Sequence, residues 1–129
     1  MNRHLMEVLE KVLREYEEKP IIGKAGVVEF NIRKWYCGTA ACAAGIACML
    51  PEFQKEGLRL SADGCFNDEF PIFREFMYVE AMQHVLDITF KQTRYLFDPM
   101  AYSGKVLPID VANRIRELLD LDELEAKLS

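Results

Sequence analysis

The most reactive side chains in this sequence are the thiols of four cysteines, Cys37, Cys42, Cys48 and Cys65. Cys37 stands in the segment Trp35-Tyr36-Cys37-Gly38-Thr39, just before an uncharged run rich in Ala and Gly. That run predicts a buried helix over 40–50 with Thr39 as its N-cap. The N–H groups at the start of a helix lower a thiol pKa and can stabilise an oxyanion.

The same segment has two other interpretations. Backbone N–H groups at a helix start also bind phosphate or carboxylate without any reaction. Alternatively, Gly38 makes a tight turn, Thr39 caps the helix and Cys37 fills a gap in the core. The sequence leaves all three interpretations open.

A second candidate is a polar stripe on a predicted helix over 71–87, formed by Glu80, Gln83, His84 and Asp87. Carboxylates one turn away can orient an imidazole and hold its proton, which suits a general base or half of a metal site. The alternative is an ordinary stripe that faces solvent. Joined to the first candidate, Cys37, His84 and Asp87 (or Glu80) would form a thiol–imidazole–carboxylate set.

Zinc and disulfides are not expected. The cysteine gaps contain no C-x-x-C pair, and Cys42 and Cys48 lie about 240° apart around a helix. Residues 1–19 are charged throughout and contain no secretory signal, so we expect a cytoplasmic protein with reduced thiols, no metal and no cofactor. The net charge of −5 argues against nucleic acid or an anionic membrane as a partner.

These side chains must be positioned by one small domain. The chain has 129 residues, of which 50% are hydrophobic and 29% charged, as is typical of a single globular domain over 1–129. Further helices are expected over 2–18 with Asn2 as N-cap, and over 89–96 with a capping box of Thr89 and Gln92. A last helix is expected over 108–119, with an inward face of Val111, Ala112, Ile115, Leu118 and Leu119. Strands are expected over 27–36, over 57–62 and near 65–66. The prediction is an α+β fold: a mostly helical domain of about five helices with a small antiparallel hairpin or sheet.

One motif suggests a family. Phe30-Asn31-Ile32-Arg33-Lys34-Trp35 leads into Cys37-Gly38-Thr39-Ala40-Ala41-Cys42-Ala43-Ala44-Gly45. This F-[DN]-x-x-x-W … C-G-T-x-x-C-x-x-G pattern resembles a group of small uncharacterised phage and bacterial proteins, and the segments 96–99 and 111–115 are similar to that group's closing segments. Ile46 stands where the group often has an aromatic residue or His. The resemblance implies a phage or mobile-element accessory protein that binds a host protein or a small signalling molecule.

A more distant similarity is to papain-like thiol enzymes, in which a Cys-Gly pair also opens a central helix. The matching residues are Cys37 and Gly38. Those enzymes carry the downstream His on a strand, whereas His84 lies in a segment predicted to be helical.

We therefore expect a non-enzymatic binding protein. Its ligand site would comprise Trp35, Tyr36, Cys37, Gly38 and Thr39, with Phe66 nearby, and would take a host protein or a small molecule such as an anion. The alternative is a thiol hydrolase or transferase that uses Cys37, with His84 as its base and Asp87 as its carboxylate. A third prediction is a homodimer that pairs through the apolar face of the helix over 71–87.

Overall fold

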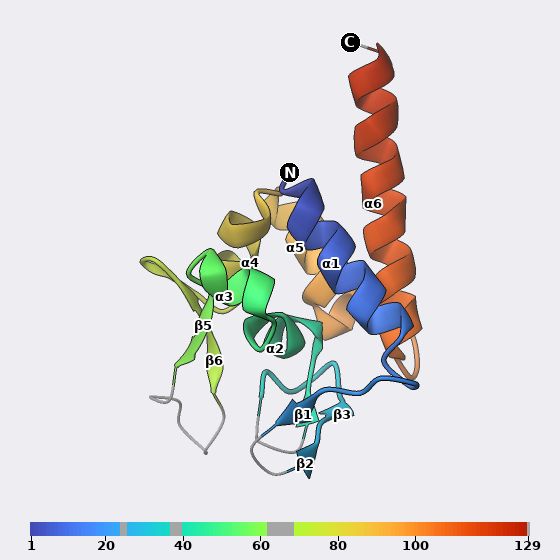
Figure 1. The fold of residues 1–129 in the computed structure, drawn as a ribbon. Helices are drawn as coiled ribbons and strands as arrows, with labels where there is room; N and C mark the ends of the chain where they lie inside the picture. The colour runs from blue at the N-terminus through green and yellow to red at the C-terminus, as the bar shows by residue number, and fades with distance from the viewer. Residues whose placement is uncertain (24–25, 37–39, 62–68, 129) are drawn as a thin grey trace.

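The computed structural model describes residues 1–23, 26–36, 40–61 and 69–128. Its α-helices are α1 (Arg3–Arg14), α2 (Ala43–Cys48), α3 (Pro51–Lys55), α4 (Val79–Leu86), α5 (Phe90–Phe97) and α6 (Pro108–Leu128), with a 3-10 turn, η2, at Pro99–Ala101. Its strands are β1 (Ile22–Gly23), β2 (Gly26–Val27), β3 (Glu29–Phe30), β4 (Ala40–Ala41), β5 (Arg59–Ser61), β6 (Phe70–Phe73) and β7 (Phe76–Met77). The predicted α+β fold, mostly helical with a small antiparallel sheet, is confirmed (Figure 1).

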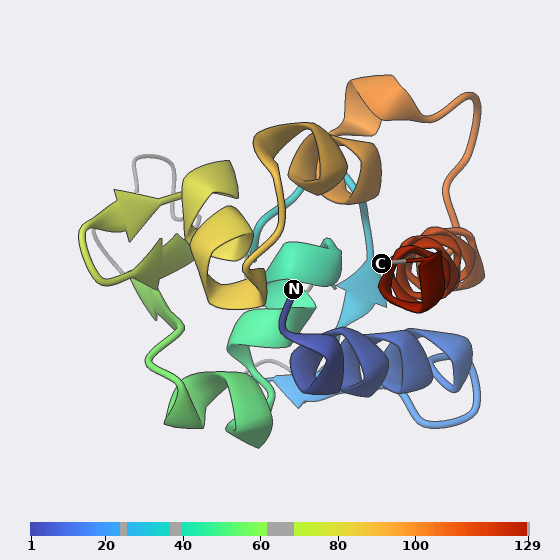
Figure 2. The ribbon, with the colours of Figure 1, turned by 90° about the horizontal axis from the view of Figure 1, so that it is seen from above.

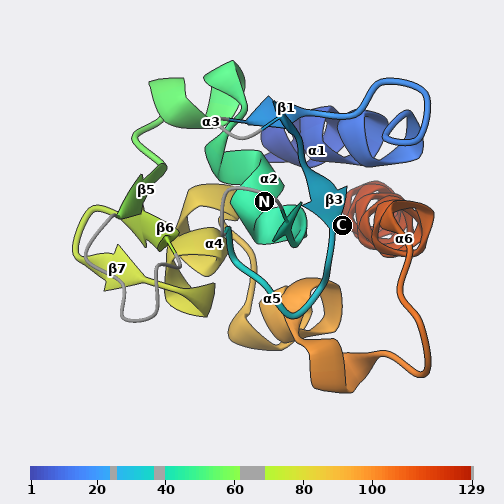
Figure 3. The same cartoon turned by 90° about the horizontal axis from the view of Figure 1, so that it is seen from below.

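Helix α2 lies at the centre of the molecule, with the other helices arranged around it (Figure 3). All six of its residues are buried, as the uncharged Ala- and Gly-rich sequence predicted. The helix is shorter than predicted, because its N-cap is Cys42 rather than Thr39. Ala40–Ala41 form strand β4, which pairs in parallel with β3, so their backbone groups are used in a sheet instead of a helix.

Helices α1 and α6 lie side by side (Figure 2). The apolar stripe of α1 is buried, and Asn2 caps this helix by accepting from the N–H of Leu5 at 3.1 Å, as predicted. The predicted inward face of α6 is also buried, namely Val111, Ala112, Ile115, Leu118 and Leu119. Beyond that face α6 continues past the body of the molecule to Leu128 (Figure 1).

The predicted helix over 71–87 is wrong in its first half. That half forms the hairpin of β6 and β7, and α4 begins only at Val79. Arg74 and Tyr78 both have positive φ, 56° and 58°, which is incompatible with a regular α-helix at those positions. The aromatic residues that were assigned to a helix face suit a pleated sheet equally well.

The remaining strand predictions have mixed outcomes. Strand 57–62 is confirmed as β5, but its described partner is β6, and the predicted strand near 65–66 lies outside the described residues. The continuous strand over 27–36 is wrong, since only β2, β3 and a bridge between Tyr36 and Ala41 form there. The predicted capping box of Thr89 and Gln92 is confirmed at the start of α5.

None of the helices in the described ranges combines the length and the apolar character that crossing a membrane requires.

Candidate functional site

The structure separates the two aromatic residues of the predicted ligand site. Tyr36 is 5% exposed and lines an open cleft, whereas the neighbouring Trp35 is half-buried and lines a different pocket. The other predicted site residues, Cys37, Gly38 and Thr39, lie outside the described residues, as does Phe66. Trp35 and Tyr36 therefore direct their side chains to two different sites.

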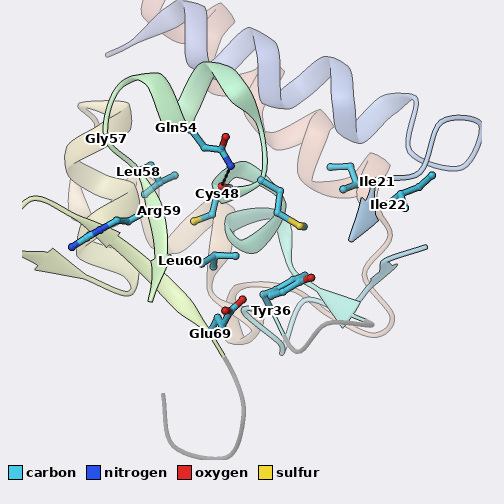
Figure 4. Close-up of a pocket in the computed structure, with 11 residues that line it drawn as sticks. Ile21, Ile22, Tyr36, Cys48, Gln54, Gly57, Leu58, Arg59, Leu60 and Glu69 are labelled. Atoms are coloured by element: carbon cyan, nitrogen blue, oxygen red, sulfur yellow. Dashed lines mark hydrogen bonds between the residues drawn. The ribbon is translucent and has the colours of Figure 1, made fainter. Parts of the chain in front are cut away.

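The larger site, here called the Tyr36 cleft, has a volume of about 790 Å³ (Figure 4). Four parts of the chain form it: the start of β1, Tyr36 between β3 and β4, the region from the end of α2 to β5, and the residue before β6. Most of the side chains that line it are apolar. The lining residues are Ile21, Ile22, Tyr36, Cys48, Met49, Gln54, Gly57, Leu58, Arg59, Leu60 and Glu69.

Polar groups are few in the Tyr36 cleft. The side chain of Gln54 donates from Nε2 to the Cys48 carbonyl at 3.1 Å, so this amide is already engaged. The N–H of Glu69 donates to the Tyr36 carbonyl at 2.8 Å and joins two sides of the cleft. Arg59 points away from the cleft in Figure 4, whereas the carboxylate of Glu69 lies beside Leu60 and Tyr36. The cleft therefore offers an apolar surface with one carboxylate.

Strand β5 adds an open sheet edge to this site. It is the outer strand of the three-stranded sheet, and Leu60 lies opposite Pro71. The Pro71 carbonyl accepts from the N–H of Tyr78 at 2.9 Å and therefore points toward β7, away from β5. In an antiparallel pair, a residue whose partner points its carbonyl away from the pair also points its own N–H and C=O away from it. Leu60 thus presents both groups at the sheet edge, and no partner for them is found among the described residues.

The described thiols are not activated. Burial raises the pKa of Cys42 to about 11, against which backbone hydrogen bonds act only weakly. Burial also raises the pKa of Cys48, in the wall of the cleft, well above its ordinary range. Both thiols are protonated at neutral pH, so neither has the thiolate that nucleophilic catalysis needs.

His84 lies on α4 with its side chain exposed. Its ring stacks on Phe76, with 3.5 Å between ring centroids and 11° between planes. Asp87 lies 3.2 Å from the amino group of Met1, and within the described structure no hydrogen bond joins the His84 side chain to Asp87 or Glu80. The polar stripe faces solvent, and the pairing of His84 with Cys37 stays a prediction, since Cys37 lies outside the described residues.

In the ranges that the structure describes, no three His, Cys, Asp or Glu residues are grouped so as to hold a metal ion.

Sequence reasoning missed most of the cleft. Leu58 and Leu60 carried a signal, because the alternation over 57–62 predicted a half-buried strand. Ile21, Ile22 and Gln54 gave none, because they are distant in sequence and only the fold brings them to the same site.

No family model, curated protein or solved structure matches the chain. The function must therefore be argued from the geometry of these two sites.

Proposed function

We propose that this chain is a non-enzymatic binding protein that takes an extended, apolar segment of a partner protein in the Tyr36 cleft. The observation that carries the proposal is the open cleft itself, about 790 Å³ in volume and lined mainly by apolar side chains from four parts of the chain. Concave apolar surfaces with a few polar groups are the usual sites of binding.

The open edge of β5 supports an extended peptide as the ligand. A peptide strand can add to a sheet edge, where main-chain hydrogen bonds supply affinity and side-chain pockets supply specificity. At β5 none of the described residues bonds to the N–H and C=O of Leu60, which leaves them to pair with a peptide, while the Leu60 side chain lines the cleft. The Glu69 carboxylate favours a partner segment that carries a Lys or Arg beside its apolar residues.

The resemblance to phage and bacterial small proteins supports one refinement. We propose that the partner is a host protein and that the chain acts on it in the cytoplasm as a mobile-element accessory protein. The raised pKa of the Cys48 thiol in the cleft supports binding over catalysis at this site.

A selection of random peptides tests the proposal. Peptides of about 12 residues would be selected on the immobilised wild-type protein and their affinities measured by calorimetry. Ile22 is 76% exposed and lines the cleft, so Ile22→Arg should leave the fold intact and block the apolar surface. We expect selected peptides to bind this variant at least about tenfold more weakly.

The matched control is Leu121→Arg, which changes an exposed leucine of α6 outside the cleft and should bind the peptides as the wild type does. Glu69→Gln should lower the affinity for peptides that carry a basic residue by about threefold. The proposal is wrong if no peptide is enriched, or if the selected peptides bind Ile22→Arg and Leu121→Arg equally well.

A further inference from the structure

A second pocket is lined by Trp35, the residue that precedes Tyr36 in the chain. This Trp35 pocket has a volume of about 350 Å³ and is formed by the β3–β4 connection, the start of α4 and the end of α5. It shares no lining residue with the Tyr36 cleft. The residues that line it are Ile32, Arg33, Trp35, Cys42, Val79, Phe97, Asp98 and Pro99.

The backbone of Trp35 is held firmly in this pocket. Its carbonyl oxygen packs so closely on α2 that a Cβ atom at Gly45 would lie 1.6 Å from it. The carbonyl of the preceding residue, Lys34, accepts a hydrogen bond from the N–H of Cys42. The indole ring lies beside Tyr78, with 6.0 Å between ring centroids. The backbone that carries the indole is therefore fixed before any ligand arrives, which lowers the entropy lost on binding.

The charges at the pocket favour an anion. Asp98 accepts from Arg94 Nη2 at 3.0 Å and from the N–H of Met100 at 2.9 Å, so its negative charge is already compensated. Arg33 is exposed, and no ion pair joins its guanidinium to any carboxylate in the described part of the chain. Arg33 thus gives the pocket a positive charge that no described carboxylate neutralises and that can pair with an anionic ligand.

We infer that the Trp35 pocket binds small aromatic carboxylates. The aromatic ring lies against Trp35, Phe97 and Pro99, and the carboxylate accepts from Arg33. A planar guanidinium and an indole suit this class of ligand, because the first pairs with a carboxylate through two parallel hydrogen bonds and the second stacks on an aromatic ring. This site is independent of the Tyr36 cleft and of the peptide proposed to bind there.

The chain has a single tryptophan, so one indole N–H signal in a ¹⁵N-correlated NMR spectrum reports on this pocket alone. The probe is phenylacetate, with 2-phenylacetamide as its neutral isostere and acetate as the anion without a ring. We expect phenylacetate to shift the indole signal in a saturable manner at millimolar concentration, and to bind about threefold to tenfold more tightly than 2-phenylacetamide. Acetate should leave the signal in place.

Arg33→Gln should abolish the preference for phenylacetate over its amide, while Arg74→Gln, at an exposed arginine that lines neither the Trp35 pocket nor the Tyr36 cleft, should keep it. An indole signal that phenylacetate does not move would overturn the inference. Equal affinity for phenylacetate and 2-phenylacetamide in the wild type would also overturn it, and so would an unchanged preference in Arg33→Gln.

Discussion

Gly45 makes the closest backbone contact between the core and the Trp35 pocket. A Cβ atom at this position would lie 1.6 Å from the carbonyl oxygen and 2.7 Å from the carbonyl carbon of Trp35. Both atoms belong to the backbone, so no side-chain rotation can relieve the overlap. The glycine therefore sets the distance between α2 and the segment that carries the two aromatic residues of the sites.

The first prediction concerns this contact. In an ordinary helix interior, replacing Gly by Ala stabilises by about 1 kcal/mol. Gly45→Ala should instead lower the free energy of unfolding by about 3 kcal/mol or more, because the overlap forces α2 and Trp35 apart. Urea denaturation measures this change.

Gly104→Ala is the control for Gly45→Ala. A Cβ atom at Gly104 meets open space, and only its φ of 69° opposes a side chain, so a loss of about 1 kcal/mol is expected. A Gly45→Ala loss no larger than that of Gly104→Ala would show that the close contact does not exist in solution.

The second prediction concerns the thiols. Burial raises the pKa of Cys42 to about 11 and raises that of Cys48 further. Iodoacetamide at about pH 8 should therefore modify both at least about 100-fold more slowly in the folded chain than in urea, as followed by mass spectrometry of each site. Equal rates in the two states would contradict the burial of these cysteines.

The same alkylation, repeated across pH, gives the pKa of the Cys37 thiol, because mass spectrometry follows the peptide that contains Cys37 separately. The thiol-enzyme alternative requires a Cys37 pKa well below that of a free thiol. A Cys37 pKa near about 8.5 would remove that alternative.

At the scale of elements, a buried carboxylate, Glu10, joins α1 to α6, in addition to the ion pair between Arg3 and Asp122. The carboxylate of Glu10 is buried and accepts from Arg116 Nη2 at 2.6 Å and from Arg14 Nε at 3.0 Å. Burial acts to raise the pKa of Glu10, but the hydrogen bonds and positive charges of Arg116 and Arg14 outweigh it and lower the pKa below its ordinary value of 4.5.

The third prediction uses the sign of this shift. A lowered pKa in the folded state stabilises the fold above about pH 4.5, and this stabilisation is lost as the pH falls through the folded pKa. Glu10→Gln should lower the free energy of unfolding by about 1 to 3 kcal/mol near pH 7, since both arginines are partly exposed. The difference from wild type should shrink between about pH 6 and about pH 3.

Asp120→Asn is the control for Glu10→Gln, because Asp120 pairs with Arg116 at 3.4 Å but is largely exposed. Asp120→Asn should change the free energy of unfolding by less than about 0.5 kcal/mol at both ends of the range from about pH 6 to about pH 3. A Glu10→Gln difference that stays constant across this pH range would argue against the lowered pKa.

Elements with strong local signals were predictable from the sequence. The capping box at Thr89 and the inward face of α6 depend on spacing within a single helix, and both are confirmed. The segment from Phe70 to Tyr78 was not predictable, because its aromatic residues fit a helix face and a sheet alike. The chain leaves helical geometry at two residues of positive φ, Arg74 and Tyr78, and neither is a glycine that would have marked these positions in the sequence.

The sites were predictable only in part, for a related reason. Trp35 and Tyr36 were expected to line one site, but each lines a different one. Which way each side chain points depends on β4, which pairs in parallel with β3 and displaces the start of α2 from residue 40 to Ala43. Strand pairing between residues distant in sequence leaves little local signal.

At the scale of the whole molecule, two consecutive residues, Trp35 and Tyr36, line two different sites. The Tyr36 cleft is open, apolar and bordered by a sheet edge, which suits an extended segment of a partner. The Trp35 pocket is smaller and is lined by Arg33, which forms no ion pair with any described residue, and this suits a small anion. The proposed homodimer through the predicted helix over 71–87 has less surface than expected, because Ala81, Met82, Val85 and Leu86 pack in the chain's own core.

The fourth prediction tests the central claim, that the Tyr36 cleft is where a partner segment binds. The measurement is a ¹³C-methyl NMR spectrum of the wild-type protein, recorded while a peptide selected on that protein is added. We expect the methyl signals of Ile21, Ile22, Leu58 and Leu60 to move, since these residues line the cleft, and those of Leu121 and Leu124 on α6 to stay in place. Shifts confined to α6, or to any surface other than the cleft, would contradict the claim.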